Sequence, residues 1–474
     1  MKWLFFCIAA AGFAAPPAPL VDAVRSGNRA AMESLLARKA DPNAAQPDGT
    51  TPLHWAARED NVEAARLLLK AGAQVKAVNQ FGVTPLSLAC ENGSGPMAEL
   101  LLKAGADANG TLPGGETMLM TAARTGRVEA VRALITAGAN VNAREGRGAQ
   151  TALMWAAAEG NGEVVGELLH AKADRDARVD SGFTAFLFAV REGQLGVVRT
   201  LVKAGVDVNE TVQPGLLTGK KFGQVRAGPR SGTGALTIAV TNAHYELAAF
   251  LLDAGADPNA ALPGFTALHV LPTVRKPGVG DNDPAPDGSG SMTAIAFVRK
   301  MAAKGANLNA RMTKRVGFGL TSINTVGATP FFMAARTADA ELMRVLAELG
   351  ADPKINNTDN STPLMAAAGL GTRSPGEDSG TEPEVLEAMQ VALDLGNDIN
   401  AVDNNGETAM HSAAYKNYPK AVEFLAAHGA RREVWDKKNK QGWTPLRIAE
   451  GYRFGNFKPS PVTVEALHRV MGIQ

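Results

Sequence analysis

The chain has 474 residues, of which 45% are hydrophobic and 20% are charged, and its 48 basic and 47 acidic residues give a net charge of +1. This composition suits a folded soluble chain. Four tyrosines and five tryptophans argue against a large aromatic ligand pocket, and the net charge alone indicates no class of partner.

The first fifteen residues differ from the rest of the chain. Lys2 precedes an apolar run from Trp3 to Phe13, and small residues lie beside a cleavage position near Ala14, which is typical of a short secretory signal peptide. The alternative is a buried N-terminal helix. A permanent anchor is disfavoured because about 20 apolar residues are needed to span a membrane. We predict that residues 1–15 are a signal peptide and that no transmembrane segment remains after its removal.

Removal of that segment takes away Cys7 and leaves Cys90 as the single cysteine. A disulfide within the mature chain is then impossible. Cys90 occupies a small apolar position, so we interpret it as a buried residue and not as a nucleophile. Export with almost no cysteine is compatible with the bacterial periplasm, and we predict a periplasmic or extracellular location.

A short motif recurs along almost the whole chain. Its first copy is Thr51-Pro52-Leu53-His54-Trp55-Ala56-Ala57, followed by an apolar pattern over residues 62–69 and by Gly72. Thr and Pro favour the start of one helix, the three- and four-residue apolar spacing predicts a second helix, and Gly ends it. Later copies, most of them 33 residues apart, open at Thr84, Thr117, Thr151, Thr184, Thr266, Thr329, Thr362, Thr408 and Thr444.

This motif and period closely resemble the ankyrin repeat family. The resemblance implies a mainly α fold, a solenoid of about 12 helix-turn-helix repeats with β-hairpin fingers, over residues 16–474. It also implies that His54, His269 and His411, which share one repeat position, make a local hydrogen bond that orders the turn. We expect the segment from Leu20 to Asn43 to be an N-terminal capping repeat.

Four long inserts interrupt the regular spacing from residue 207 onward. Residues 210–232 and 311–328 lengthen fingers between repeats, whereas residues 272–291 and 370–383 separate the two helices of one repeat. The fingers at 210–232, 311–328 and 431–443 each carry a net charge of +3, while the two inter-helix inserts are net negative. In ankyrin-like stacks the fingers project along one edge, so positive charge should collect there.

No motif with an established catalytic chemistry occurs in the chain. Residues 214–221 superficially resemble a phosphate-binding loop, but the spacing is one residue short and Lys221 replaces the hydroxyl residue that would hold magnesium. Asp281 and Asp287 lie in a stretch that hints at calcium, yet it lacks a ligand and the glycine of the EF-hand pattern. We therefore predict no catalytic residue, no cofactor and no metal site.

The resemblance implies that a partner contacts the finger tips and the residues after the paired alanines of each first helix. On the first helices these are positions such as Arg336, Thr337, Tyr415 and Lys416. The partner-binding residues that we predict are Arg58, Glu59, Phe81, Arg124, Arg191, Glu192, Lys220, Lys221, Arg226, Arg230, Lys314, Arg315, Trp435 and Trp443.

These features predict a non-catalytic protein–protein interaction scaffold of the cell envelope. We expect an acidic protein partner, bound through the basic fingers and the concave surface of the first helices. An anionic envelope polymer is a second candidate ligand, and nucleic acid is not expected in an exported protein. The alternative is an enzyme or redox-accessory protein whose site is built from the long inserts.

Overall fold

The computed structural model describes residues 19–146, 148–213, 231–278, 285–317, 321–453, 455 and 458–473. These residues form two compact units. Unit 1 holds residues 19–189 and 196–206, and unit 2 holds residues 190–195 together with the described residues from 207 onward. The predicted signal peptide and most of the insert at 210–232 lie outside the described residues.

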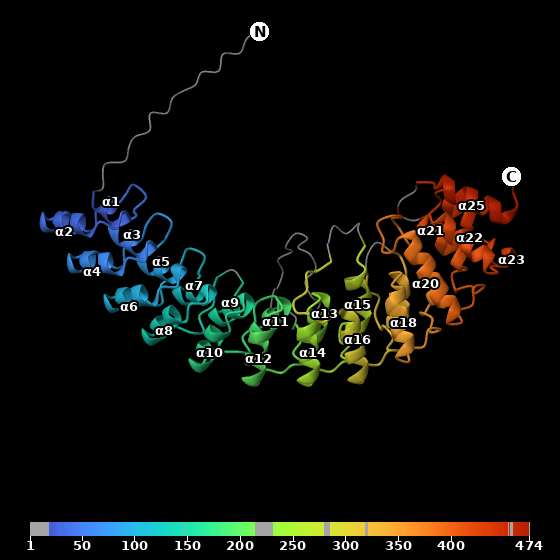
Figure 1. Ribbon diagram of the computed structural model, residues 1–474, viewed down its shortest axis with the longest axis horizontal. Helices are drawn as coiled ribbons and strands as arrows, with labels where there is room; N and C mark the ends of the chain where they lie inside the picture. Colours follow the sequence, from blue (N-terminus) through green and yellow to red (C-terminus); the bar gives the residue numbers. More distant parts are fainter. Residues whose placement is uncertain are drawn as a thin grey trace, which may run out of the picture. The chain divides into compact units, whose positions relative to one another are not determined.

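Unit 1 consists of helix pairs that stack in chain order (Figure 1). First helices pack on first helices, as in α3 on α5, and second helices on second helices, as in α6 on α8. The helices are α1 (Pro19–Arg25), α2 (Arg29–Ala37), α3 (Pro52–Arg58), α4 (Val62–Lys70), α5 (Pro85–Asn92), α6 (Gly95–Lys103), α7 (Met118–Thr125), α8 (Val128–Thr136), α9 (Ala152–Glu159) and α10 (Gly162–His170), with α11 (Ala185–Arg191) and α12 (Leu195–Lys203) at the unit boundary.

Unit 2 repeats this pairing with longer connections. One short helix, α23, lies in the connection between two pairs. The helices are α13 (Ala235–Thr241), α14 (Tyr245–Asp253), α15 (Ala267–Arg275), α16 (Ala294–Ala303), α17 (Pro330–Arg336), α18 (Ala340–Glu348), α19 (Pro363–Ala368), α20 (Glu382–Asp394), α21 (Ala409–Lys416), α22 (Pro419–Ala427), α23 (Arg432–Trp435), α24 (Pro445–Ala449) and α25 (Pro461–Met471).

The predicted threonines begin the first helices. The Thr51 hydroxyl accepts a hydrogen bond from the His54 backbone N–H, and His54 Nδ1 accepts one from the Thr51 N–H at 3.1 Å. With Nδ1 accepting, Nε2 carries the proton and donates to the Val83 carbonyl, 3.0 Å away in the next repeat. The structure therefore confirms the turn-ordering role of this histidine and adds a link between neighbouring repeats.

The second helices end as the glycine pattern predicted. Gly72 has a φ of 93°, in the left-handed region, and so do Gly105 and Gly138 at the equivalent positions. Lys172 occupies the same position in the next repeat with a φ of 66°. A residue with a Cβ is less favourable there, so a locally weaker helix end at Lys172 stays a prediction.

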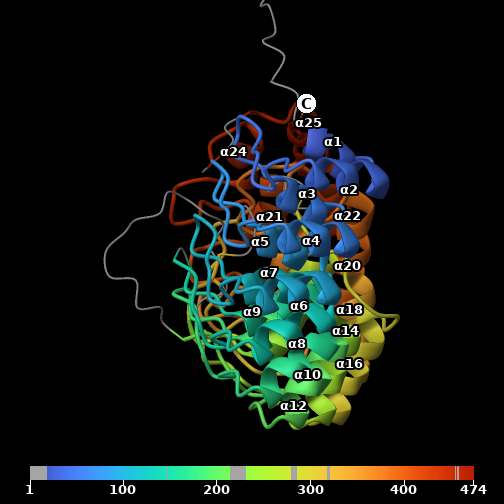
Figure 2. The same cartoon turned by 90° about the vertical axis from the view of Figure 1, so that its left-hand side faces the viewer.

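The fingers differ from the predicted β-hairpins. Successive connections of unit 1 all project to one side of its helices (Figure 2). Among the described residues they contain no β-strand, and only isolated bridges form, such as Thr111 with Thr117 and Thr211 with Gly234. Side chains replace the ladder: Asn43 accepts a hydrogen bond from the Gln74 N–H at 2.7 Å and donates to the Gly72 carbonyl at 3.2 Å.

The described parts of the two inter-helix inserts pack within unit 2. The first begins later than predicted, because α15 continues through Pro272 to Arg275. The Ser379 hydroxyl of the second insert donates to the Lys276 carbonyl at 2.8 Å, so the two inserts touch although about a hundred residues of sequence separate them. The second insert also meets the finger at 321–323, where the Ser322 N–H donates to the Gly371 carbonyl at 2.8 Å.

Candidate functional site

A groove in unit 1 brings together two of the predicted partner-binding residues. It has a volume of about 580 Å³ and lies between the finger that carries Phe81 and the ends of α3 and α5. Phe81 is 63% exposed, and Arg58 also lines the groove. An exposed aromatic side chain beside a charged helix end is typical of a protein-binding surface.

Two arginines flank a tryptophan at this groove. The guanidinium of Arg25 lies 4.3 Å from the ring centroid of Trp55, and that of Arg58 lies 5.5 Å away. The indole N–H of Trp55 donates to Gln46 at 2.9 Å, which fixes the ring plane. Within the described residues neither arginine forms an ion pair, so both charges face solvent and can meet a carboxylate of another molecule.

Trp55, which lines the groove, and Arg25, which lies over its ring, were not among the predicted partner-binding residues. The sequence did contain a signal for Trp55, because Trp155 occupies the same repeat position in a later repeat. There the Arg124 guanidinium lies 5.7 Å from the centroid of the Trp155 ring. Arg124 differs from Arg58 in having a carboxylate neighbour, Glu116, at 4.0 Å.

The predicted residues Arg191 and Glu192 pair with each other. The Arg191 Nε donates to a Glu192 carboxylate oxygen at 2.7 Å. Glu59 is exposed beside Arg58 and makes no ion pair in the described part of the chain. Arg58, Glu59 and Glu192 are therefore exposed at first-helix ends, and their contact with a partner stays a prediction.

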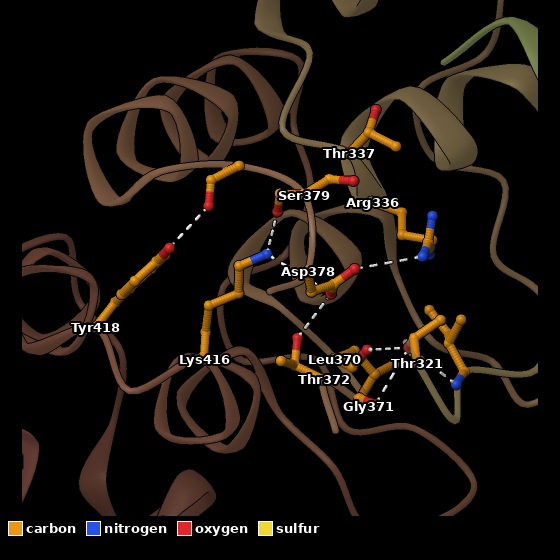
Figure 3. Close-up of polar contacts among 12 residues, drawn as sticks. Thr321, Arg336, Thr337, Leu370, Gly371, Thr372, Asp378, Ser379, Lys416 and Tyr418 are labelled. Atoms are coloured by element: carbon orange, nitrogen blue, oxygen red, sulfur yellow. Dashed lines mark hydrogen bonds and ion pairs between the residues drawn. The ribbon is translucent and has the colours of Figure 1, made fainter. Parts of the chain in front are cut away.

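The corresponding ends in unit 2 are buried, which contradicts the prediction for Arg336, Thr337, Tyr415 and Lys416. Their exposed fractions are 4%, 0%, 6% and 1%. The insert that follows α19 lies beside Arg336, Thr337 and Lys416 (Figure 3) and supplies Asp378. One Asp378 oxygen lies 3.4 Å from the Arg336 guanidinium, and the other lies 3.7 Å from the Lys416 ammonium and accepts the Thr372 hydroxyl at 3.0 Å.

This buried charge cluster holds the insert against α17 and α21. The Lys416 ammonium also donates to the Ser379 carbonyl, and the Tyr418 hydroxyl donates to the Gly380 carbonyl at 2.8 Å. Burial lowers the pKa of Lys416, and the negative charge of Asp378 opposes that shift. Asp378 already contacts the Arg336 guanidinium, the Lys416 ammonium and the Thr372 hydroxyl, so it is poorly placed to act on a substrate.

Some of the predicted basic residues of the fingers are exposed. Lys314 and Arg315 are both exposed, although Arg315 donates to the Ser322 carbonyl at 3.0 Å within its own finger. In the third finger Lys437, Lys438 and Lys440 are exposed and form no ion pair within the described residues. Lys220, Lys221, Arg226 and Arg230 lie outside the described residues.

The two predicted tryptophans of the third finger contribute to packing. Trp435 is 3% exposed at the end of α23, and its N–H donates to the Ala430 carbonyl at 3.3 Å. Trp443 is half-buried against Tyr415 and Ile448. The prediction that Trp435 is offered to a partner is therefore wrong, because the finger folds into a short helix that turns the indole inward.

The buried titratable groups of the repeat motif show no sign of chemical reactivity. Burial lowers the pKa of His269 and of His411 to about 4 and raises the pKa of the Cys90 thiol to about 12. A thiol with such a pKa is a poor nucleophile at neutral pH, which agrees with the structural role predicted for Cys90.

Family models support the architecture. The model described as Ankyrin repeats (3 copies) matches residues 20–111, 75–145, 97–178, 119–212 and 382–456, and the model Ankyrin repeat matches residues 231–261. Together they match more than half of the chain, so the protein belongs to the ankyrin repeat family. The count of about twelve repeats stays a prediction, because these models leave parts of unit 2 unmatched.

The chain is also similar to segments of curated proteins. It is 32% identical to human Neurogenic locus notch homolog protein 1 over 144 residues, which cover 26% of this chain and 6% of that protein. It is 34% identical to Ankyrin repeat, SAM and basic leucine zipper domain-containing protein 1 of Dasypus novemcinctus over 114 residues, 24% of this chain and 22% of that protein. It is 33% identical to Glycerophosphocholine phosphodiesterase GDE1 of Candida albicans over 72 residues, which cover 15% of this chain and 6% of that protein. The chain thus spans under a quarter of the length of each of these relatives.

None of the helices among the described residues is both long and apolar enough to cross a membrane.

Proposed function

We propose that this ankyrin repeat protein is a non-catalytic scaffold that binds an acidic protein partner on the groove of unit 1. Ankyrin repeats suggest a protein–protein interaction role, and the groove with its exposed Phe81 supports a contact there. The observation that carries the proposal is the pair Arg25 and Arg58, which flank Trp55 without an ion pair of their own beside the exposed Phe81. A partner segment with a carboxylate next to an apolar side chain would satisfy both features.

The basic fingers support the same sign of partner. Lys314 is exposed and unpaired among the described residues, as are Lys437, Lys438 and Lys440. Each exposed lysine adds little binding energy alone, but together they raise the rate of encounter with an acidic surface. We propose these fingers as a steering surface, with an anionic envelope polymer as the second candidate ligand.

The cell envelope is part of the proposal and rests on the apolar run near the N-terminus. The test is N-terminal sequencing of the native protein, which should begin near Ala15 after cleavage of the signal peptide. An intact Met1 in a cytosolic fraction would remove the envelope from the proposal without affecting the groove.

The rival function is an enzyme or redox-accessory protein built from the long inserts. One relative carries an enzyme's name, but the match covers only 6% of that protein. Asp378 is the acidic centre of the insert at 370–383, and it is held by Arg336, Thr372 and Lys416. An acid–base catalyst needs a group that can meet a substrate, so the scaffold is better supported.

The experiment is affinity capture from the native envelope fraction, followed by mass spectrometry and by affinity measurement on the captured partner. The double variant Arg58→Gln with Phe81→Ser should weaken that affinity at least about tenfold, since it removes an aromatic anchor and an unpaired cation. The matched control is Arg66→Gln on α4, an arginine that already pairs with Glu63 at 3.5 Å. Equal affinity of the double variant and the wild type would exclude this groove.

A further inference from the structure

A buried glutamate in unit 2 has one oxygen without a partner. Glu407 is only 6% exposed, and it precedes the threonine that begins α21. Its Oε1 accepts hydrogen bonds from the Asn439 amide at 2.8 Å and from the Tyr415 hydroxyl at 3.1 Å. Its Oε2 has no hydrogen-bond partner among the described residues. Burying an unpaired carboxylate oxygen is costly, so its retention calls for an explanation.

The equivalent glutamate in unit 1 shows what is missing. Glu116 also precedes the first-helix threonine, and it is paired with Arg124, seven residues after that threonine, at 4.0 Å. Glu116 also accepts the Thr121 hydroxyl at 2.8 Å. In the repeat of Glu407 the position of Arg124 is occupied by Tyr415. The chain therefore keeps the carboxylate in unit 2 but has lost the cation that neutralises it in unit 1.

A pocket of about 230 Å³ lies beside Glu407, and further carboxylates line it. Asp403 is buried and accepts hydrogen bonds from the Ser361 hydroxyl at 2.8 Å and the Asn405 N–H at 2.8 Å. Asp359 accepts the Asn324 amide at 3.0 Å. All these donors are neutral, and within the described residues none of the three carboxylates forms an ion pair. The pocket is therefore acidic and not compensated by a cation of its own lining.

We propose that this pocket binds an organic cation, an ammonium or a guanidinium group, whose charge pairs with Glu407. The ligand takes the place that Arg124 holds beside Glu116 in unit 1. The volume equals that of roughly seven or eight waters in the liquid, which suffices for the end of a lysine or arginine side chain or for a small free amine. This site is separate from the unit 1 groove and does not depend on the proposed scaffold function.

A metal ion fits the pocket less well than an organic cation. Calcium needs six to eight oxygen ligands that converge on one point. Among the described residues no group of three acidic, histidine or cysteine side chains converges closely enough to hold a metal ion. The oxygens of Asp403 and Asp359 are already used by neutral donors, whereas a single unpaired oxygen with hydroxyl and amide neighbours suits N–H donors.

Binding of a cation should favour the ionised form of Glu407 and should release a proton below about pH 7. Burial, with a contribution from the nearby charge of Asp403, raises the pKa of Glu407 to about 7. The groups that face Glu407 are Asp403, the Tyr415 hydroxyl and Asn439, with Asp359 beyond Asp403 and Arg453 at 5.9 Å from the Tyr415 ring. A bound cation stabilises the carboxylate, so affinity must rise with pH. With a pKa near 7, affinity at pH 5 should be lower than at pH 8 by roughly 90-fold if only the ionised form binds.

The test is isothermal titration calorimetry of the full-length protein at pH 5 and pH 8. The probes are a blocked tripeptide with a central arginine, the same peptide with a central lysine, the neutral citrulline analogue of the arginine peptide, and agmatine. We expect saturable binding of the cationic probes at pH 8, weaker binding at pH 5 and none of the citrulline peptide. Tighter binding of the peptides than of agmatine assigns the cation to a protein side chain, and the reverse order assigns it to a free small amine.

Three variants separate charge recognition from folding. Glu407→Gln keeps an acceptor for Asn439 and Tyr415 and should weaken the cationic probes about tenfold or more. Tyr415→Arg supplies the missing cation within the chain, as Arg124 does for Glu116, and should abolish binding. The control Glu116→Gln changes the equivalent, already paired glutamate and should leave binding unchanged. Equal affinity for arginine and citrulline peptides, undiminished binding by a folded Glu407→Gln protein, or the absence of saturable binding would overturn the proposal.

Discussion

Arg58 and Glu59 of unit 1 occupy the same repeat positions as Tyr415 and Lys416 of unit 2, yet the first two are exposed and the second two are buried. The difference comes from an insert of the preceding repeat, because α3 and α21 are both followed by a short turn of their own. In unit 1 a short turn leaves the first-helix end open. In unit 2 the long insert after α19 covers it and provides Asp378 for the buried cations. One repeat framework therefore yields an exposed or a covered first-helix end, depending on the length of a loop in the neighbouring repeat.

The largest effect is expected at the buried first-helix ends of unit 2. Replacing Asp378 with Asn leaves the buried Arg336 and Lys416 without the carboxylate that lies between them. Breaking a buried ion pair by removal of one partner costs about 3–5 kcal/mol. We expect hydrogen exchange, followed by mass spectrometry, to show loss of protection in α17, α19 and α21 and unchanged protection in unit 1.

The matched control for Asp378→Asn breaks an exposed pair in unit 1. Arg132 donates to Glu167 at 3.0 Å, and Glu167→Gln should change the free energy of unfolding by at most about 1 kcal/mol. Equal effects of Asp378→Asn and Glu167→Gln would contradict the assignment of the insert as a cover that holds unit 2 together.

The second effect concerns acid sensitivity. The pKa of His411 is lowered by burial to about 4 from a usual 6.5, so the folded state binds fewer protons than the unfolded state between these values. Its contribution to stability is present above pH 6.5 and is lost as the pH falls toward 4, by up to about 3 kcal/mol. Glu407 acts in the opposite direction, because its pKa is raised to about 7 and its burial costs stability as the pH rises from 4.5.

The measurement should therefore use a Glu407→Gln background, which removes the opposing contribution of Glu407. The free energy of unfolding is measured with denaturant at pH 7.5 and at pH 4.5. Its loss between these pH values should be smaller in the double variant Glu407→Gln with His411→Gln than in Glu407→Gln alone. The control is His428→Gln, which changes an exposed histidine outside the helix-start position of the repeat. Identical pH slopes with and without His411 would refute this assignment.

The sequence predicted what is local and missed what is not. Helix starts at the threonines and helix ends such as Gly72 depend on caps and backbone conformation within a few residues, so spacing alone located them. The burial of Lys416 depends on Asp378, 38 residues earlier, and no short-range pattern encodes that contact. The signal for the Glu407 pocket was a comparison of repeats: tyrosine stands where another repeat has the arginine that pairs with its glutamate.

A smaller effect is expected at the Lys172 helix end of unit 1. The left-handed conformation costs a residue with a Cβ about 1–2 kcal/mol. Glycine avoids this cost, but its greater conformational entropy in the unfolded chain offsets part of the gain. Lys172→Gly should therefore stabilise unit 1 by about 0.5–1 kcal/mol. The reciprocal variant Gly138→Lys, at the same position one repeat earlier, should destabilise by a similar amount. Thermal unfolding of both variants checks the sign.

The smallest effect on stability, and the sharpest contrast with buried Lys416, is expected at the exposed lysines of the third finger. Replacing Lys437, Lys438 and Lys440 with Ser removes three unpaired surface charges, and the hydrogen bond that His411 donates to the Lys437 backbone carbonyl is kept. Substitutions of this kind usually change stability by less than about 0.5 kcal/mol.

The consequence of this variant should appear in binding. If an acidic partner is steered by the fingers, its association rate should fall and the salt dependence of that rate should flatten, because fewer charges act over the Debye length. The corresponding change in the first finger, Lys220, Lys221, Arg226 and Arg230 to Ser, should act in the same direction. The Arg58→Gln with Phe81→Ser variant should instead raise the dissociation rate, since it removes contacts and not steering. Unchanged association rates and salt dependence in both finger variants would leave the groove of unit 1 as the sole proposed contact surface for the acidic partner.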